Sequence, residues 1–204
     1  MKYITLDIGN VLCEVHSDSF IREISEMFNV TIPDAGRFLK RFQQLHDLGY
    51  TTMADELIDK FNIKSSIIID KVVSSWNRSV VPNLKILDAL CDLSESSHDL
   101  QVALLSNIGI EHALMMEEKL SHRNLYPKAI KHFSCYVGAR KPSYVFYQSF
   151  LLEHPEFKGC LYVDDLKENL DAGAKFGFIP FHFDLKDDNF ESKIKDIELF
   201  IINS

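Results

Sequence analysis

Short apolar, β-branched runs alternate along the chain with segments whose apolar residues recur every three or four positions. The first run ends at Leu6, and four more follow at 100–105, 132–137, 160–163 and 178–183. The segments between and after them, at 142–152, 169–176 and 190–201, have helical spacing. Strands that alternate with helices predict an α/β fold, in which a Rossmann-like parallel sheet is flanked by helices.

Residues 17–83 break this alternation. Apolar residues recur at helical spacing around Phe20 and again around Phe42, and the segment contains no convincing strand. Residues 48–52 (LGYTT) indicate a turn between two of its helices. We therefore predict a small α-helical cap at 17–83, inserted after the first strand of a core formed by 1–16 and 84–204.

Composition narrows the classes of partner. The 204 residues carry a net charge of −8 and no run of Lys or Arg, which argues against nucleic acid or an anionic membrane as the main partner. No apolar run has the length of a membrane span, and Asp7 interrupts the N-terminal apolar stretch that a signal peptide needs. We expect a cytoplasmic protein.

The four cysteines, Cys13, Cys91, Cys135 and Cys160, have neither CxxC spacing nor the density of a disulfide scaffold. Cys135 and Cys160 lie in apolar runs that are typical of strands. The pattern predicts free, buried thiols in a reducing compartment.

Polar side chains follow the predicted strands, where a parallel sheet places its ligand site. In chain order they are Asp7, Ser106 with Asn107, Lys141, and Asp164 with Asp165. Each alone has a simpler interpretation: Ser106 and Asp164 as helix caps, Lys141 as a solvated loop residue. Together, three carboxylates at one sheet edge would repel one another unless a hard cation or Lys141 neutralised them. This combination predicts a Mg²⁺ site that handles a phosphate.

Four segments in this order, LDIGNVL, LLSN, GARKP and LYVDDLKEN, resemble the motifs of the haloacid dehalogenase (HAD) superfamily. The likeness spans the whole chain, and the predicted insertion falls where that family carries a helical cap. It is greatest to small phosphatases whose first motif reads Asp-x-Gly-Asn-Val, similar to sugar-1-phosphate phosphatases and epoxide hydrolase N-terminal domains. The resemblance implies a Mg²⁺-dependent hydrolase of a small phosphorylated metabolite, with sugar phosphates among its substrates.

The resemblance also implies roles for residues. Asp7 matches the nucleophile that forms an aspartyl-phosphate, and Lys141 the lysine that neutralises it. Ser106 matches the hydroxyl that binds a phosphoryl oxygen, with Asn107 beside it. The implied metal ligands are Asp7, the carbonyl of Gly9, Asp164 and Asp165.

Gly9 departs from the family pattern. Most phosphatases of the family carry a second Asp there, which acts as general acid and base and is worth about 10²–10⁴-fold in rate. Three interpretations stay open: a phosphatase of substrates with good leaving groups, a haloacid dehalogenase, or a domain that binds without catalysis. His16 and Asp18 are the residues that by position could replace the missing group, although His16 is also typical of an exposed linker.

The cap is expected to close over the site and to select the substrate. Its candidate lid residues are Phe42, His46, Tyr50 and Trp76, all of which are also compatible with packing inside the cap.

Overall fold

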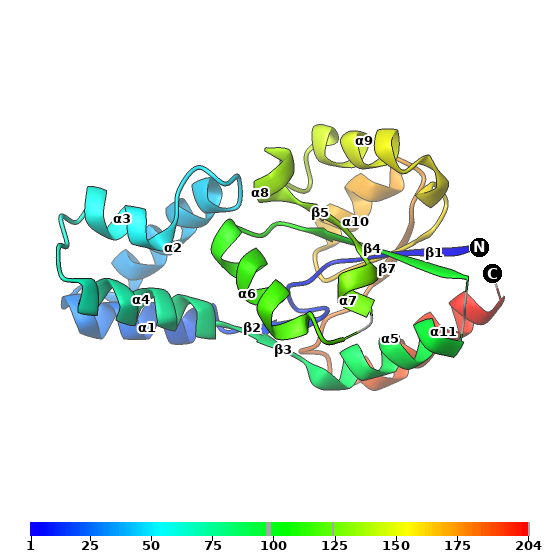
Figure 1. Ribbon diagram of the computed structural model, residues 1–204, viewed down its shortest axis with the longest axis horizontal. Coiled ribbons are helices and arrows are strands. Elements are labelled where there is room, and N and C mark those ends of the chain that lie inside the picture. Colours follow the sequence, from blue (N-terminus) through cyan, green and yellow to red (C-terminus); the bar gives the residue numbers. More distant parts are fainter. Residues whose placement is uncertain (97–98, 124, 204) are drawn as a thin grey trace.

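The computed structural model describes residues 1–96, 99–123 and 125–203. Its centre is a five-stranded parallel sheet of order β5-β4-β1-β6-β7 (Figure 1). The strands are β1 (Lys2–Leu6), β4 (Leu100–Ser106), β5 (Ile130–Phe133), β6 (Leu161–Asp164) and β7 (Ile179–His182). The predicted α/β fold with a parallel sheet is therefore confirmed. β1 is central, paired with β4 on one side and β6 on the other, so that Leu6 has both Leu104 and Val163 as register partners.

Helices cover both faces of the sheet, as the apolar strands require. One apolar cluster joins the sheet to α5 (Leu84–Ser96), α6 (Ile110–Leu120), α7 (Leu125–Lys128) and α11 (Phe190–Asn203). A second cluster, rich in aromatic side chains, joins the other face to α9 (Tyr144–Glu153), η1 (Pro155–Phe157) and α10 (Lys167–Ala174). Figure 1 shows α5 and α11 below the sheet and α9 and α10 above it.

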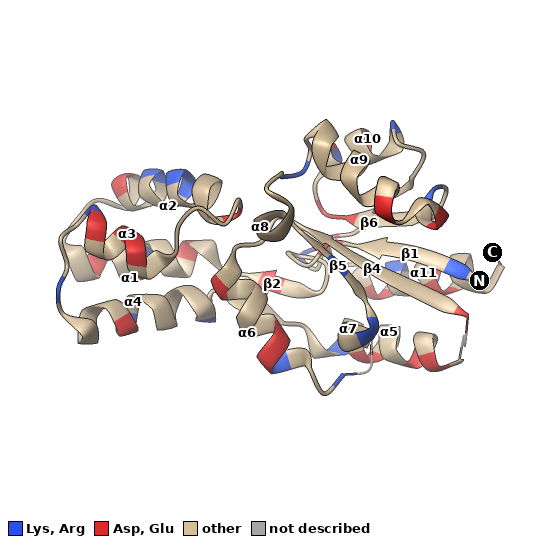
Figure 2. Ribbon diagram, turned by 45° about the horizontal axis from the view of Figure 1, so that its top comes forward, with Lys and Arg blue, Asp and Glu red and all other residues tan. Residues whose placement is uncertain are grey.

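Four helices form a separate helical lobe beside this core (Figure 1). They are α1 (Ser17–Phe28), α2 (Ile32–His46), α3 (Met53–Asp59) and α4 (Ser66–Arg78). Their apolar faces enclose a third cluster, which includes Phe20, Phe42 and Trp76. Figure 2 shows lysine and arginine spread singly over the lobe and the core, apart from a short run on α2.

Two short strands connect the helical lobe to the core. β2 (Cys13–Val15) leads into α1, β3 (Val80–Pro82) follows α4, and the two pair antiparallel with Val15 opposite Val80. The sequence did not reveal them, because three residues are too few to show a period of two. α1 begins at Ser17 and α5 at Leu84, next to the predicted boundaries of the insertion. The domain division itself stays a prediction, and its core range includes residues 97, 98, 124 and 204, which lie outside the described residues.

The predicted strand at 132–137 is wrong in its second half. β5 ends at Phe133, and Ser134–Val137 form the short helix α8, which ends at Gly138 in the left-handed conformation with φ 66°. The Ser134 hydroxyl accepts a hydrogen bond from the Ile108 amide (2.9 Å), which ties the start of α8 to the loop after β4. Tertiary contacts thus override the β-branched and aromatic composition of this run.

All four cysteines are free. Cys13 and Cys160 are buried, as predicted, whereas Cys91 and Cys135 are only half-buried, and Cys135 lies in α8 rather than in a strand. Among the described residues, no helix has the length and apolar content that a membrane crossing requires.

Two helical glycines provide a matched test of the packing. A Cβ on Gly36 in α2 would lie 3.9 Å from Ile21, whereas one on Gly173 in α10 would lie 2.7 Å from the ring of buried Tyr162. We expect Gly36→Ala to raise the free energy of unfolding by about 0.5–1 kcal/mol, because alanine is the better helix former. Gly173→Ala should lower it by about 1–3 kcal/mol through overpacking. Urea denaturation of both variants measures this, and equal effects would contradict the described packing of α10.

Candidate active site

The structure brings the predicted residues together at the carboxyl edge of the sheet. Asp7 directly follows the central strand β1, and its amide donates to the carbonyl of Val163 in β6 (2.9 Å). Ser106 ends β4 on one side of it, and Asp164 ends β6 on the other. One carboxylate oxygen each of Asp7, Asp164 and Asp165 lies within 4.8 Å of the others.

Lys141 reaches into this cluster from the loop after α8. Its buried Nζ donates to Asp7 Oδ1 and to Asp164 Oδ2, each at 2.7 Å. Asn107 fixes the backbone of the lysine, since its Oδ1 accepts from the Lys141 amide (2.8 Å) and its Nδ2 donates to the Lys141 carbonyl (2.9 Å). The Asn107 amide is therefore engaged with the chain, and it positions Lys141.

Groups other than Lys141 also hold the Asp164 carboxylate. Its Oδ2 accepts from the Tyr162 hydroxyl (2.5 Å), and its Oδ1 accepts from the Leu166 amide and from Asn169 Nδ2, both at 2.9 Å. Both carboxylate oxygens of this fully buried residue thus have protein partners. The arrangement orients Asp164 toward Lys141.

Asp165 is oriented by Asn10, to which the sequence analysis gave no role beyond its place in the first motif. Asn10 has a left-handed backbone (φ 52°), which asparagine tolerates better than most residues. Its Nδ2 donates to Asp165 Oδ2 (2.9 Å), and its own Oδ1 is buried without a partner. The Asn side chain therefore presents an unsatisfied oxygen beside the carboxylates.

Burial and mutual repulsion perturb the charges of the cluster. The pKa of Asp7 is raised to about 6, first by burial and also by Asp164 and Asp165, against the lowering effect of Lys141. Burial likewise raises the pKa of Asp165. Burial alone would lower the pKa of Lys141, but Asp7 and Asp164 outweigh it and hold the ammonium charged. In Asp164 the same lysine outweighs burial and lowers the pKa.

This donor set fits a hard divalent cation. Three carboxylates face one ammonium, and the Asn10 oxygen beside them lacks a partner. Mg²⁺ prefers carboxylate and carbonyl oxygens, and a bound cation would reverse the repulsion that raises the pKa of Asp7.

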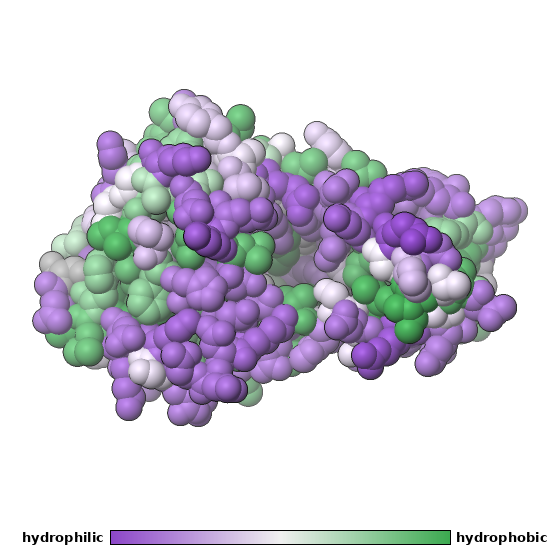
Figure 3. Space-filling model, turned by 180° about the vertical axis from the view of Figure 1, so that it is seen from behind, coloured by the Kyte–Doolittle hydropathy of each residue, from purple (hydrophilic) through white to green (hydrophobic). Residues whose placement is uncertain are grey.

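A cavity of about 90 Å³ lies where the helical lobe meets the core, next to these residues. Gly9, Ser106, Asn107 and His112 line it from the core, and Gln43, Asp47 and Trp76 line it from the lobe, among other residues. From behind, the surface is indented where the two parts meet (Figure 3).

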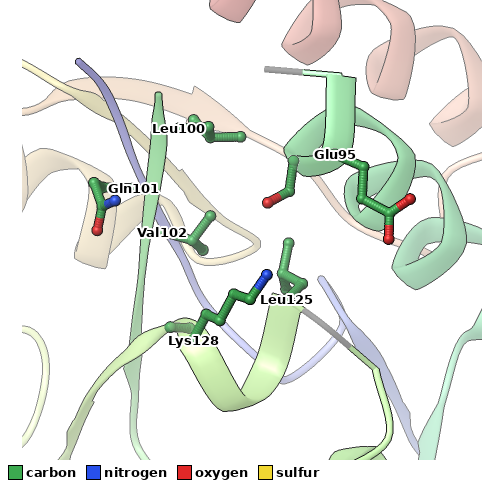
Figure 4. A pocket seen from close by; sticks show the side chains of 8 residues that line it. Glu95, Leu100, Gln101, Val102, Leu125 and Lys128 are labelled. Atoms are coloured by element: carbon green, nitrogen blue, oxygen red, sulfur yellow. The ribbon is translucent and has the colours of Figure 1, made fainter. Parts of the chain in front are cut away.

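The two largest cavities among the described residues lie away from this chemistry. One of about 490 Å³ is at the opposite end of β4, between Leu100, Glu95 and Lys128 (Figure 4). The other, of about 400 Å³, is an apolar cavity within the helical lobe, lined mainly by residues such as Phe38 and Phe61.

Side chains of the helical lobe and the core meet around the interface cavity. His46 Nε2 donates to Glu111 (3.1 Å), whose carboxylate also accepts from the Met53 amide (2.9 Å). Arg140 pairs with Asp47 at 2.8 Å. The close approach of His46 in the lobe to the core depends on Gly109, since a Cβ at this position would lie 2.0 Å from the His46 ring.

The predicted lid residues have different positions. Phe42 belongs to the core of the lobe, and Trp76 is packed there but also borders the cavity. His46 is buried at the interface, and Tyr50 is 72% exposed.

The residues predicted to replace the missing acid lie elsewhere. His16 is half-exposed, close to Glu14 (3.4 Å), and borders a different surface hollow; Asp18 is exposed.

No family model matches the sequence, and no curated protein matches it. Solved structures do. A HAD-family enzyme of Bacteroides thetaiotaomicron is similar at a TM-score of 0.77 and 18% identity, covering 92% of this chain and 96% of that one. A HAD-like family hydrolase of Porphyromonas gingivalis is similar at a TM-score of 0.75 and 18% identity, and the match covers 97% of this chain and 98% of that one. An L-2-haloacid dehalogenase is similar at a TM-score of 0.62 and 16% identity, and the match covers 98% of this chain and 99% of that one. The chain therefore has the fold of HAD-family enzymes, which confirms the resemblance at the level of fold.

The raised pKa of Asp7 predicts a pH-dependent stability of the metal-free protein. The folded-state pKa of Asp7 (about 6) exceeds the ordinary value of 3.8, so the folded protein binds the proton of this carboxyl more tightly than the unfolded chain does. The stability that the protonated carboxyl contributes is therefore complete below pH 4 and is lost as the pH rises through 6. Asp7→Asn should therefore raise the free energy of unfolding at pH 8 by up to about 3 kcal/mol, with little difference at pH 4. Thermal melts in EDTA measure this; a lower melting temperature of the variant at pH 8 would contradict it.

Proposed function

We propose that the protein is a Mg²⁺-dependent phosphomonoester hydrolase of a small phosphorylated metabolite, acting through an aspartyl-phosphate. The observation that carries this proposal is the Lys141 ammonium, 2.7 Å from both Asp7 and Asp164, with Asp165 as a third carboxylate beside them. Such a cluster at the carboxyl edge of a parallel sheet suits an anionic group that binds together with a metal.

The first chemical step uses Asp7. Its carboxylate oxygen attacks phosphorus, the bond to the leaving-group oxygen breaks, and an aspartyl-phosphate forms. Lys141 keeps Asp7 ionised and offsets the charge that develops on the phosphoryl oxygens. Ser106, which lines the cavity above the sheet edge, donates its hydroxyl to one of these oxygens.

Asp7, Asp165 and the Gly9 carbonyl would hold the metal. Mg²⁺ supplies positive charge that binds the phosphoryl group and stabilises its transfer. Asp164 directs its oxygens to Lys141, Tyr162, Asn169 and the Leu166 amide, so we place it next to the metal site as the group that positions Lys141.

Known structures of the same fold support this choice. The Bacteroides thetaiotaomicron enzyme has been crystallised as a complex with magnesium and inorganic phosphate. The size of the interface cavity, about 90 Å³, favours a small leaving group. Gly9 cannot protonate a leaving group, so substrates that expel a stable anion, such as anomeric sugar phosphates or acyl phosphates, suit the site best.

A haloacid dehalogenase is the second candidate. Two observations favour it: the absence of a carboxylate at Gly9, since a halide leaves without a proton, and the similarity to L-2-haloacid dehalogenases. The carboxylates of Asp164, Asp165 and Asp47 oppose it, because they would repel the carboxylate of a haloacid.

We expect purified protein to release p-nitrophenol from p-nitrophenyl phosphate with Mg²⁺ and not with EDTA. Asp7→Asn should reduce this rate by more than about 10³-fold, because the variant has no nucleophile. Unchanged activity of the variant would contradict the assignment of Asp7. Halide release from 2-chloropropionate, with no phosphatase activity, would instead support the dehalogenase.

Mg²⁺ binding tests the ligand assignment separately from turnover. At 100 times its dissociation constant, Mg²⁺ should stabilise the wild type by about 2.7 kcal/mol, measured as a rise in melting temperature. Asp165→Asn should remove most of this rise, whereas Asp164→Asn should keep it and lose activity, because it disturbs Lys141. Equal loss of the rise in both variants would show that Asp164 is itself a ligand.

A further inference from the structure

The proposed hydrolysis leaves one chemical task unassigned. In the second step water must attack the aspartyl-phosphate and give up a proton, but Gly9 has no side chain to accept it. Any side chain that takes this role must reach the space above Asp7. The interface cavity borders that space, because Gly9 and Ser106 form part of its wall.

The helical lobe brings one carboxylate to this cavity. Asp47, directly after α2, lines it and is only 9% exposed. Its position is fixed from the core, because a guanidinium nitrogen of Arg140 lies 2.8 Å from Asp47 Oδ2. On its own helix, His46 Nδ1 lies 3.6 Å from Asp47 Oδ1. The following turn packs against α8 so closely that a Cβ on Gly49 would lie 2.8 Å from the Cys135 carbonyl.

His112 is the other titratable side chain among the described residues that line the cavity. Its Nε2 donates to the Trp76 carbonyl (3.1 Å), and burial lowers its pKa to about 4. The Nε2 of His112 is therefore already occupied by the Trp76 carbonyl.

We propose that Asp47 of the helical lobe is the general base for hydrolysis of the aspartyl-phosphate, in place of the side chain that Gly9 lacks. This inference rests on the proposed function. The water oxygen forms a bond to phosphorus, its proton passes to Asp47, and the bond between phosphorus and Asp7 breaks with its electron pair returning to the Asp7 carboxylate. Inorganic phosphate leaves, and Asp47 returns the proton to solvent.

This assignment ties the second step to the position of the lobe. Asp47 belongs to the lobe, whereas Asp7 and Ser106 belong to the core. The base is therefore in place only when the lobe contacts the core as it does through Arg140 and Glu111. Formation of the aspartyl-phosphate uses core residues and does not need Asp47 when the leaving group is a stable anion.

Rapid-quench kinetics with p-nitrophenyl phosphate and Mg²⁺ separate the two steps. Asp47→Asn should release about one p-nitrophenol per site at the wild-type rate, followed by turnover slowed by about 10²–10⁴-fold, the usual contribution of a general base. The aspartyl-phosphate should accumulate and be trapped by hydroxylamine.

Two further variants make the test specific. Arg140→Gln breaks the ion pair that positions Asp47 but keeps its carboxylate, so it should slow hydrolysis of the aspartyl-phosphate less than Asp47→Asn does. A Cβ on Gly9 would meet only ordinary contacts, 3.5 Å to Val15 and 3.8 Å to Asp7, and the Gly9 backbone is not left-handed. Gly9→Asp in the Asp47→Asn background should therefore restore turnover.

The outcomes distinguish the two proposals. Unchanged turnover in Asp47→Asn, or a burst and a steady rate that fall together, overturns the role of Asp47 and leaves the phosphatase intact. An intact, folded wild type that hydrolyses neither this ester nor acetyl phosphate overturns the proposed function, and the role of Asp47 with it.

Discussion

The candidate site depends on one buried ammonium shared by two carboxylates. Lys141 Nζ lies 2.7 Å from Asp7 and from Asp164, and the surrounding polar groups serve to keep it there. Asn107 holds the Lys141 backbone through two hydrogen bonds. Tyr162 and other donors orient the Asp164 carboxylate toward Lys141. A buried cation of this kind is stable only when its partners are fixed, because an unpaired buried charge is costly. The sheet supplies that rigidity through adjacent strand ends.

Most of this arrangement could be predicted from the sequence, since it follows from topology. Asp7, Ser106 and Asp164 end neighbouring strands of a parallel sheet, and the pattern of apolar runs identifies those ends. Asn10 and Tyr162 could not be recognised in this way. Their roles depend on a left-handed backbone and on the direction of a buried hydroxyl, neither of which leaves a periodic signal.

The interface between lobe and core was the least predictable part. Asp47 follows an amphipathic helix and looks like an ordinary helix end in the sequence, and only the contact with Arg140 in a distant loop places it at the cavity. His16, which precedes the lobe and is near Gly9 in sequence, lies instead at another surface. Proximity along the chain is a poor guide where an inserted unit folds back over the site, because its tertiary packing decides which residues return.

The paired strands β2 and β3 bring the two connections of the helical lobe side by side. The chain leaves the core and returns to it at register partners, Val15 and Val80, so the two crossing points are adjacent. A two-residue turn between them would complete an ordinary β-hairpin without moving any strand of the central sheet. The lobe can therefore be lengthened, shortened or replaced while the strand ends that carry Asp7, Ser106 and Asp164 keep their places in the sheet.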